Sequence, residues 1–262
     1  MDVYYTLPPV SRTITAAALI ASVGVHAGFI PFYYVAFIPQ LLWKIPPDIW
    51  RPFSSFLITG AGWGLIFDLY FLYKYSSALE TESPRFSRPG DFPTYIAFCW
   101  VVILATAGYF MNGIIFMSAL ELAFAYTYSQ DNPYRKTTFY IVTIQTRFLP
   151  YVLLLMTLVM GGQYAAMRQA TGLIAAHLYD FLTRIWPTYG GGRNYIQTPE
   201  FVARMFGSQA RSQRNRGYGV AYAPGNRARE DTPAGRTTGW TSNFGMGSSW
   251  GRRGPGRRLG GD

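Results

Sequence analysis

The chain has 262 residues, of which 50% are hydrophobic, 18% are aromatic and only 14% are charged. Soluble domains carry about 25% charged residues, so this composition argues against an ordinary soluble domain and favours a membrane protein. The single cysteine, Cys99, excludes an intrachain disulfide. The formal net charge of +10 lies mostly in residues 188–262, which hold twelve arginines and four acidic residues. The chain therefore divides into an apolar part, residues 1–187, and a basic glycine-rich tail.

Residues 1–187 contain six apolar stretches, and crossing a bilayer as a helix takes about 20 such residues. Charged residues, prolines and the turn-like Met-Asn-Gly at 111–113 separate these stretches. They cover about residues 13–34, 52–73, 92–110, 114–130, 148–167 and 169–185. The first stretch is too long for the core of a cleavable signal peptide, so we expect it to be retained. The sequence predicts an all-α membrane domain of six transmembrane helices.

The segment between the first two stretches, residues 37–51, is broken by prolines and ends near a tryptophan. These features predict an amphipathic loop lying in the membrane interface. Six spans would place both termini on one side of the membrane. Lysine and arginine concentrate at the span ends on that side and in the tail, so the positive-inside rule predicts that both termini are cytosolic.

Five segments resemble the Derlin family, whose members are rhomboid-fold pseudoproteases of the endoplasmic reticulum membrane. They are "WRPFSSFL" from Trp50, "DLYFLYKYSSALE" from Asp68, "QTRFLPYVLL" from Gln145, "GLIAAHLYDFL" from Gly172 and "GGRNYIQTPEF" from Gly191. The similarity runs from residue 1 to about 205. It implies a rhomboid-like bundle of six transmembrane helices, and a role in moving misfolded proteins from the endoplasmic reticulum to cytosolic degradation.

The resemblance directs attention to His177, which occupies the position of the rhomboid catalytic histidine in the sixth span. An intramembrane serine protease also needs a placed hydroxyl nucleophile and oxyanion donors. The best serine, Ser118, is flanked by methionine and alanine and lacks the glycines of the rhomboid motif. We therefore expect no enzymatic activity and regard His177 as a degenerate remnant. The alternative is an active rhomboid-type serine protease that uses Ser118, His177 and Asp180.

Asp180 lies three residues after His177, on the same helix face, where the resemblance leads us to expect an aromatic residue. Gly172 and Ala176 in the same span form a small-xxx-small pair, which predicts close helix packing. Ionisable residues inside spans are expensive and indicate a polar partner or a wet cavity. The candidates for such a cavity are Asp68, Glu121 and Arg147.

The pair Trp50–Arg51 at the end of the first loop has two interpretations. Tryptophan at headgroup level and arginine on lipid phosphate would anchor the loop in the interface. The Derlin resemblance implies instead that the pair marks the first loop of the rhomboid fold, holds that loop and engages substrates.

The tail is too rich in glycine, arginine, serine and asparagine to build a core, so we expect it to be mostly disordered. The interleaved aromatic residues allow an RNA-binding interpretation, and the charge allows a tether to anionic lipid. A third interpretation rests on "WGRRGPGRRLGGD" from Trp250, which resembles the motif by which Derlins recruit the AAA segregase valosin-containing protein. The residues that would form it, within 250–261, are Trp250, Gly254, Gly256, Leu259 and Gly260.

These observations predict a factor that binds misfolded proteins in the endoplasmic reticulum membrane and promotes their retrotranslocation. Its expected partners are the lipid bilayer, the segregase and a membrane ubiquitin ligase complex, together with other Derlins if it forms a homo- or hetero-oligomer. We favour the segregase motif over RNA binding and expect no nucleic acid partner. No cofactor or metal is expected, because His26 and His177 are the only histidines and no P-loop is present. A structural membrane chaperone that moves no substrate remains a weaker alternative.

Overall fold

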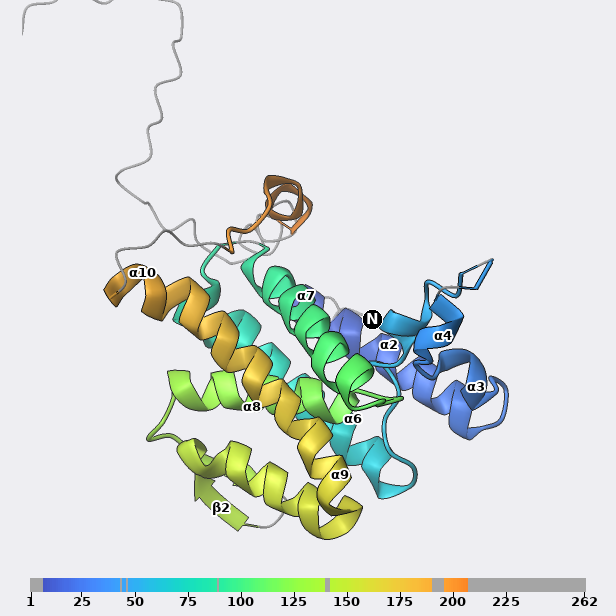
Figure 1. The fold of residues 1–262 in the computed structure, drawn as a ribbon. Helices are drawn as coiled ribbons and strands as arrows, with labels where there is room; N and C mark the ends of the chain where they lie inside the picture. The colour runs from blue at the N-terminus through green and yellow to red at the C-terminus, as the bar shows by residue number, and fades with distance from the viewer. Residues whose placement is uncertain are drawn as a thin grey trace, which may run out of the picture. The chain divides into compact units, whose positions relative to one another are not determined.

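The computed structural model describes residues 7–42, 44–45, 47–88, 90–139, 142–189 and 196–206. These residues are mostly helical, as the sequence predicts (Figure 1). The expected segregase motif at 250–261 lies outside the described residues. The division of the chain after residue 187 stays a prediction.

The first helix, α2, spans Pro9–His26 and ends earlier than the apolar stretch predicts. Gly28 follows it with a φ of 78°, a conformation that glycine adopts without strain and that turns the chain away from the helix axis. The segment of residues 31–54, which includes the predicted loop at 37–51 and is called the first loop below, contains three single-turn helices, α3 (Phe32–Val35), α4 (Pro39–Leu42) and α5 (Arg51–Ser54).

Helix α6 spans Trp63–Glu82 rather than the predicted 52–73. Residues 52–62 instead complete α5 and an irregular segment that ends at Gly62, whose φ is 62°. Two acids in the last turn of α6 have partners: Glu80 accepts hydrogen bonds from Ser11, and Glu82 pairs with Arg135. A 3₁₀ turn, η1 (Pro84–Phe86), connects α6 to the next helix.

Helix α7 (Asp91–Ile103) continues into the π-helix η2 (Leu104–Phe110), close to the predicted third stretch. Helix α8 spans Met117–Asp131, and 11 of its 15 residues are buried. It contacts α6, α7 and α9, and is therefore the central helix of the bundle (Figure 1).

A hairpin of β1 (Lys136–Phe139) and β2 (Val142–Gln145), which was not among the predicted elements, follows α8. Its strands pair antiparallel.

A 3₁₀ turn, η3 (Thr146–Phe148), leads from the hairpin into α9 (Leu149–Asp180), which is kinked at Gly162, where φ is 79°. The kink separates a first half from a second half, residues 163–180, which returns alongside α8. The π-helix η4 (Phe181–Ile185) and the short α10 (Trp186–Tyr189) follow.

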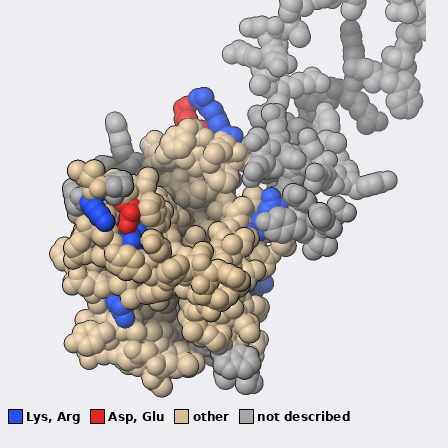
Figure 2. All heavy atoms as spheres, turned by 90° about the vertical axis from the view of Figure 1, so that its right-hand side faces the viewer, with Lys and Arg blue, Asp and Glu red and all other residues tan. Residues whose placement is uncertain are grey.

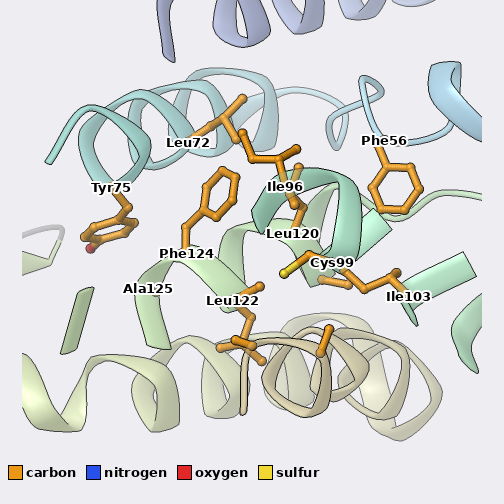
Figure 3. Close-up of a cluster of buried hydrophobic side chains, with 14 of the residues drawn as sticks. Phe56, Leu72, Tyr75, Ile96, Cys99, Ile103, Leu120, Leu122, Phe124 and Ala125 are labelled. Carbon is orange, nitrogen blue, oxygen red and sulfur yellow. The ribbon is translucent and has the colours of Figure 1, made fainter. Parts of the chain in front are cut away.

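The core lies where α6, α7 and α8 meet. Figure 3 shows aliphatic and aromatic side chains from these helices, and Phe56 from the segment before α6, packed together around α8. The labelled members are Phe56, Leu72, Tyr75, Ile96, Cys99, Ile103, Leu120, Leu122, Phe124 and Ala125. All of them are at most 4% exposed. The lone cysteine is thus a core side chain, which fits its position in an apolar run.

Two described helical stretches are long and apolar enough to cross a membrane: Asp91–Phe110, with 20 residues, and Thr146–Tyr189, with 44. Lys, Arg, Asp and Glu are sparse on the face shown in Figure 2. Together with the composition, these features indicate a membrane protein. Helices α2 and α6 begin at other residues than the predicted spans do. The prediction relied on the length of sequence without charged residues, whereas the position of a helix end also depends on the groups that bond to its terminal residues.

Candidate functional site

Arg51 holds the first loop together from within. Its side chain is only 1% exposed. Nε donates to Asp48 Oδ2 at 2.7 Å, and Nη1 donates to the carbonyl oxygens of Tyr33 at 2.5 Å and Ala36 at 2.9 Å. The guanidinium carbon also lies 4.9 Å from the centroid of the Tyr33 ring. Arg51 therefore binds the protein's own carbonyls rather than a lipid phosphate, and its planar fork joins α5 to the α3 turn.

Trp50 contacts the same α3 turn from the protein surface. Its Nε1 donates to the carbonyl oxygen of Tyr34 at 3.1 Å, while the side chain remains 48% exposed. The indole thus has one fixed polar contact and a free apolar face, as is usual for tryptophan at an apolar–polar boundary. Trp50 and Arg51 together therefore combine an exposed aromatic surface with a buried guanidinium that holds the loop together, which we call the clamp.

An apolar pocket of about 300 Å³ lies between the first loop and η2. Its lining residues are Phe37, Leu42, Pro52, Leu104 and Tyr109. One of these lining residues, Pro52, follows Arg51 directly in the chain.

The candidate catalytic residues do not come together. His177 is exposed, and its Nδ1 lies 3.0 Å from the hydroxyl oxygen of Tyr126. Ser118 is eight residues before Tyr126 on α8, about 12 Å along the helix axis. The carboxylate of Asp180 contacts the guanidinium groups of Arg85 and Arg184 rather than His177. His177 thus pairs with a phenol where a protease would need a serine hydroxyl.

Asp180 pairs with Arg85, which was not among the predicted site residues. Arg85, in η1, donates from Nη1 to Asp180 Oδ1 at 2.6 Å and from Nε to Asp131 Oδ1 at 2.5 Å. Asp131 also accepts from Ser83 Oγ at 2.5 Å. The signal available in the sequence was the carboxylate of Asp180 itself, since an acid near a span requires a cation or a polar partner. The position of Asp180 in the sequence does not identify this cation, because Arg85 is 95 residues away in the chain.

Gly172 makes the closest approach between α9 and α8. A Cβ on this residue would overlap the carbonyl oxygen of Ala119 and lie 3.1 Å from the Ala119 Cα. Ala176, one turn later, is 1% exposed. These small side chains let the two backbones approach, as small-xxx-small pairs do in membrane helices.

The three cavity candidates are not gathered in one place. Asp68 accepts a hydrogen bond from the Gly60 N–H at 2.9 Å, at the start of α6. Glu121, near the start of α8, is 4% exposed, and its Oε1 has no hydrogen-bond partner among the described residues. Asp68 is a charged neighbour of Glu121. Arg147 lies beyond the opposite end of α8, exposed, with its guanidinium carbon 4.5 Å from the Phe148 ring.

Comparison with known proteins relates this arrangement to a family. The sequence profile of the Der1-like family matches residues 7–200. The chain belongs to this family. It is 30% identical to Derlin-1 of Bos taurus over 252 residues, which covers 94% of the chain and 97% of that relative. It is 27% identical to Derlin-1 of Arabidopsis thaliana over 234 residues, 86% of the chain and 85% of the relative.

The Derlin resemblance read from the sequence is therefore confirmed. The match to Derlin-2.1 of Zea mays, 28% identical over 217 residues, covers less of both chains: 78% of this chain and 84% of the relative. Family membership and the two apolar helical stretches together identify a Derlin-type membrane protein.

Proposed function

We propose that this Derlin is a factor of endoplasmic-reticulum-associated degradation. It binds misfolded lumenal or membrane proteins and promotes their retrotranslocation to the cytosol, where they are ubiquitinated and degraded by the proteasome. The observation that carries the proposal is the match to the Der1-like family over residues 7–200, with relatives named Derlin-1 that align along 94% of the chain.

The membrane domain is proposed to be a rhomboid-like bundle of six spans with both termini in the cytosol. Its spans are α2, α6, α7 with η2, α8 and the two halves of α9. The kink at Gly162 supports the division of α9 into two spans, because a single straight helix would be much longer than a bilayer is thick. The excess of arginine in the tail supports the orientation.

The protein is proposed to work without hydrolysing peptide bonds. The contact of His177 with Tyr126, and of Asp180 with Arg85, supports this, since neither residue is available to activate Ser118 as a nucleophile. Energy would come from the segregase valosin-containing protein, recruited through residues 250–261, and ubiquitin from a membrane ligase complex. Glycines in such a motif let an extended strand lie close to a partner, while Trp250 and Leu259 fill pockets.

The deciding experiment measures the half-life of a misfolded reporter of the endoplasmic reticulum in cells that lack this protein. The cells are rescued with the wild type or with the double variant Ser118→Ala, His177→Ala. We expect both to restore rapid turnover. Rescue by the wild type alone would support an active protease, and rescue by neither would reject a role in degradation.

Recruitment of the segregase is tested separately with the full-length protein. The variant Leu259→Ala, Gly260→Ala is expected to lose co-purification with the segregase, while Arg257→Ala, in the variable part of the motif, retains it. Equal recovery with both variants would remove residues 250–261 from the proposal.

A further inference from the structure

The apolar pocket beside the first loop is built from two separate parts of the chain. Phe37, Leu42 and Pro52 line it from the loop, and Leu104 and Tyr109 line it from η2. Its volume of about 300 Å³ is at the small end of the range for ligand cavities. Four of the five lining side chains are hydrocarbon, and the fifth adds only the hydroxyl of Tyr109. The pocket therefore suits an apolar group.

The π-helix η2 explains why two of these side chains share the pocket. Leu104 and Tyr109 are five residues apart. In an α-helix, residues five apart point about 140° away from each other, because each residue advances by about 100°. The hydrogen bonds of a π-helix join residue i to residue i+5, so such residues lie near one face. The wider turn of η2 therefore brings both side chains to the pocket.

Phe37 is held firmly as one wall of the pocket. It is 1% exposed, and its ring lies edge-on to the rings of Tyr109 and Phe116, with centroids 5.8 and 5.4 Å away. A Cβ on Gly108 would lie 2.8 Å from Phe37 Cε1, so a larger residue there would push against the ring. The backbone N–H of Phe37 donates to the carbonyl oxygen of Ile114 at 2.9 Å. These contacts fix the wall without any ligand.

The pocket offers few partners to a polypeptide backbone. In hydrocarbon, every N–H and C=O of an extended segment needs a hydrogen-bond partner. The N–H of Phe37 is already bonded, Pro52 has none, and among the lining side chains only Tyr109 carries a polar group. A lipid acyl chain has no polar groups and needs only apolar contact. The lining therefore favours an acyl chain over an extended peptide.

Two residues suited to the level of the lipid headgroups lie close to the pocket. Lys44 follows Leu42 by two residues, and Trp50 precedes Pro52 by two, so the Cα atoms of each pair are at most about 8 Å apart. Trp50 is 48% exposed, and exposed tryptophan is typical of the membrane interface. The face that carries α3 and α4 is turned toward the viewer in Figure 2, and charged side chains are sparse on it. The pocket is therefore placed for the upper part of an acyl chain.

Lys44 is the cation that a lipid phosphate would meet beside the pocket. Lys44 and Arg51 are the basic residues of the first loop. Arg51 is buried and bonded to Asp48 and to two backbone carbonyls, so it does not reach a lipid. Lys44 is exposed and pairs with no acid among the residues that the structure describes. Lysine near a membrane surface attracts anionic lipid, and its long side chain reaches the headgroups.

We propose that this pocket binds one acyl chain of an anionic phospholipid, with the lipid phosphate at Lys44. The bound chain contacts the first loop and η2 together, because the pocket is lined from both. The inference goes beyond the proposed function, since the site needs a membrane but no misfolded substrate.

Photo-crosslinking in vesicles tests the site. The full-length protein is reconstituted in phosphatidylcholine vesicles with a trace of phosphatidic acid that carries a diazirine in one acyl chain. Mass spectrometry identifies the crosslinked residues. We expect crosslinks at Leu104 and Tyr109 that added unlabelled phosphatidic acid reduces several-fold. Val159 and Tyr164 on α9, which are 75% and 80% exposed, report contact with bulk lipid and should not respond to the competitor. If labelling at the pocket also ignores the competitor, the pocket holds bulk lipid only and the proposal is wrong.

Two substitutions separate the chain pocket from the phosphate contact. Leu104→Trp fills the pocket and is expected to lower labelling at Tyr109 several-fold. Leu155→Trp, at a 58% exposed position on α9, is the matched control and should leave that labelling unchanged. Lys44→Gln should abolish the preference for labelled phosphatidic acid over labelled phosphatidylcholine, whereas Lys44→Arg keeps it. Unchanged labelling in Leu104→Trp would reject the pocket, and an unchanged preference in Lys44→Gln would reject the phosphate contact.

An apolar transmembrane peptide with a photoreactive leucine, added to the same vesicles, tests the other occupant. We expect it to leave the lipid crosslinks at the pocket unchanged. If it displaces the lipid and crosslinks to Leu104 and Tyr109 itself, the pocket takes polypeptide and the phospholipid assignment is overturned. None of these readouts involves turnover of a reporter, so a failure of the proposed function would leave the result on the lipid site intact.

Discussion

Ser11 and Glu80 lie 69 residues apart in the chain, and yet the carboxylate of Glu80 caps the N-terminus of α2. Glu80 Oε2 accepts hydrogen bonds from the backbone N–H of Ser11 at 2.7 Å and from its hydroxyl at 2.6 Å. Glu80 Oε1 accepts from the backbone N–H of Val10 at 3.0 Å. The first N–H groups of a helix have no partner within it, and a negative charge there is favourable. An acid on α6 therefore supplies the cap that α2 lacks in its own sequence.

We expect Glu80→Ala to destabilise the protein by about 1–3 kcal/mol, because three hydrogen bonds to a charged acceptor are lost at a helix end. Thermal unfolding in detergent micelles measures the change. Glu82→Ala is the matched control. Glu82 pairs with Arg135 at an exposed site, where an ion pair contributes about 0–1 kcal/mol. Equal effects of the two variants would contradict the capping role.

Arg51→Lys tests the clamp of the first loop. Lysine keeps the charge but cannot bind the Asp48 carboxylate and the two backbone carbonyls with one planar group. We expect a loss of about 1–3 kcal/mol and faster proteolysis within residues 37–51, detected by mass spectrometry of the fragments. Arg204→Lys, at an 80% exposed position, should leave the cleavage pattern unchanged. Identical protease resistance of Arg51→Lys and the wild type would show that the fork is dispensable.

Gly172→Ala tests the packing between α8 and α9. The added methyl group would overlap the Ala119 carbonyl oxygen, and inserting atoms into a packed core costs about 1–3 kcal/mol or more. The expected result is a lower melting temperature. In Gly64→Ala, by contrast, the new Cβ would lie 3.7 Å from Asp68 Oδ2, an ordinary contact. This helical position should gain about 0.5–1 kcal/mol from alanine. A tolerated Gly172→Ala would mean that the helices can separate without loss.

Glu121→Leu separates stability from function. A carboxylate that is 4% exposed and has an unpartnered oxygen among the described residues disfavours folding, so leucine should raise the melting temperature. If Glu121 lines a polar path for substrates, the same variant should slow turnover of the misfolded reporter. Glu121→Gln, which keeps the polarity, should turn the reporter over faster than Glu121→Leu. A stabilised Leu variant with unchanged turnover would limit Glu121 to a structural role.

The membrane character, the Derlin family and the approximate place of the helix at Asp91–Phe110 could be predicted from the sequence. Apolar length and family motifs are local properties of the chain and can be read without coordinates. Only the folded chain shows that α6 begins at Trp63, that Arg51 faces carbonyl oxygens and that Asp180 pairs with Arg85. Each depends on groups brought together by folding, 95 residues apart in the last case, and the stability of a buried charge is set by its neighbours in space.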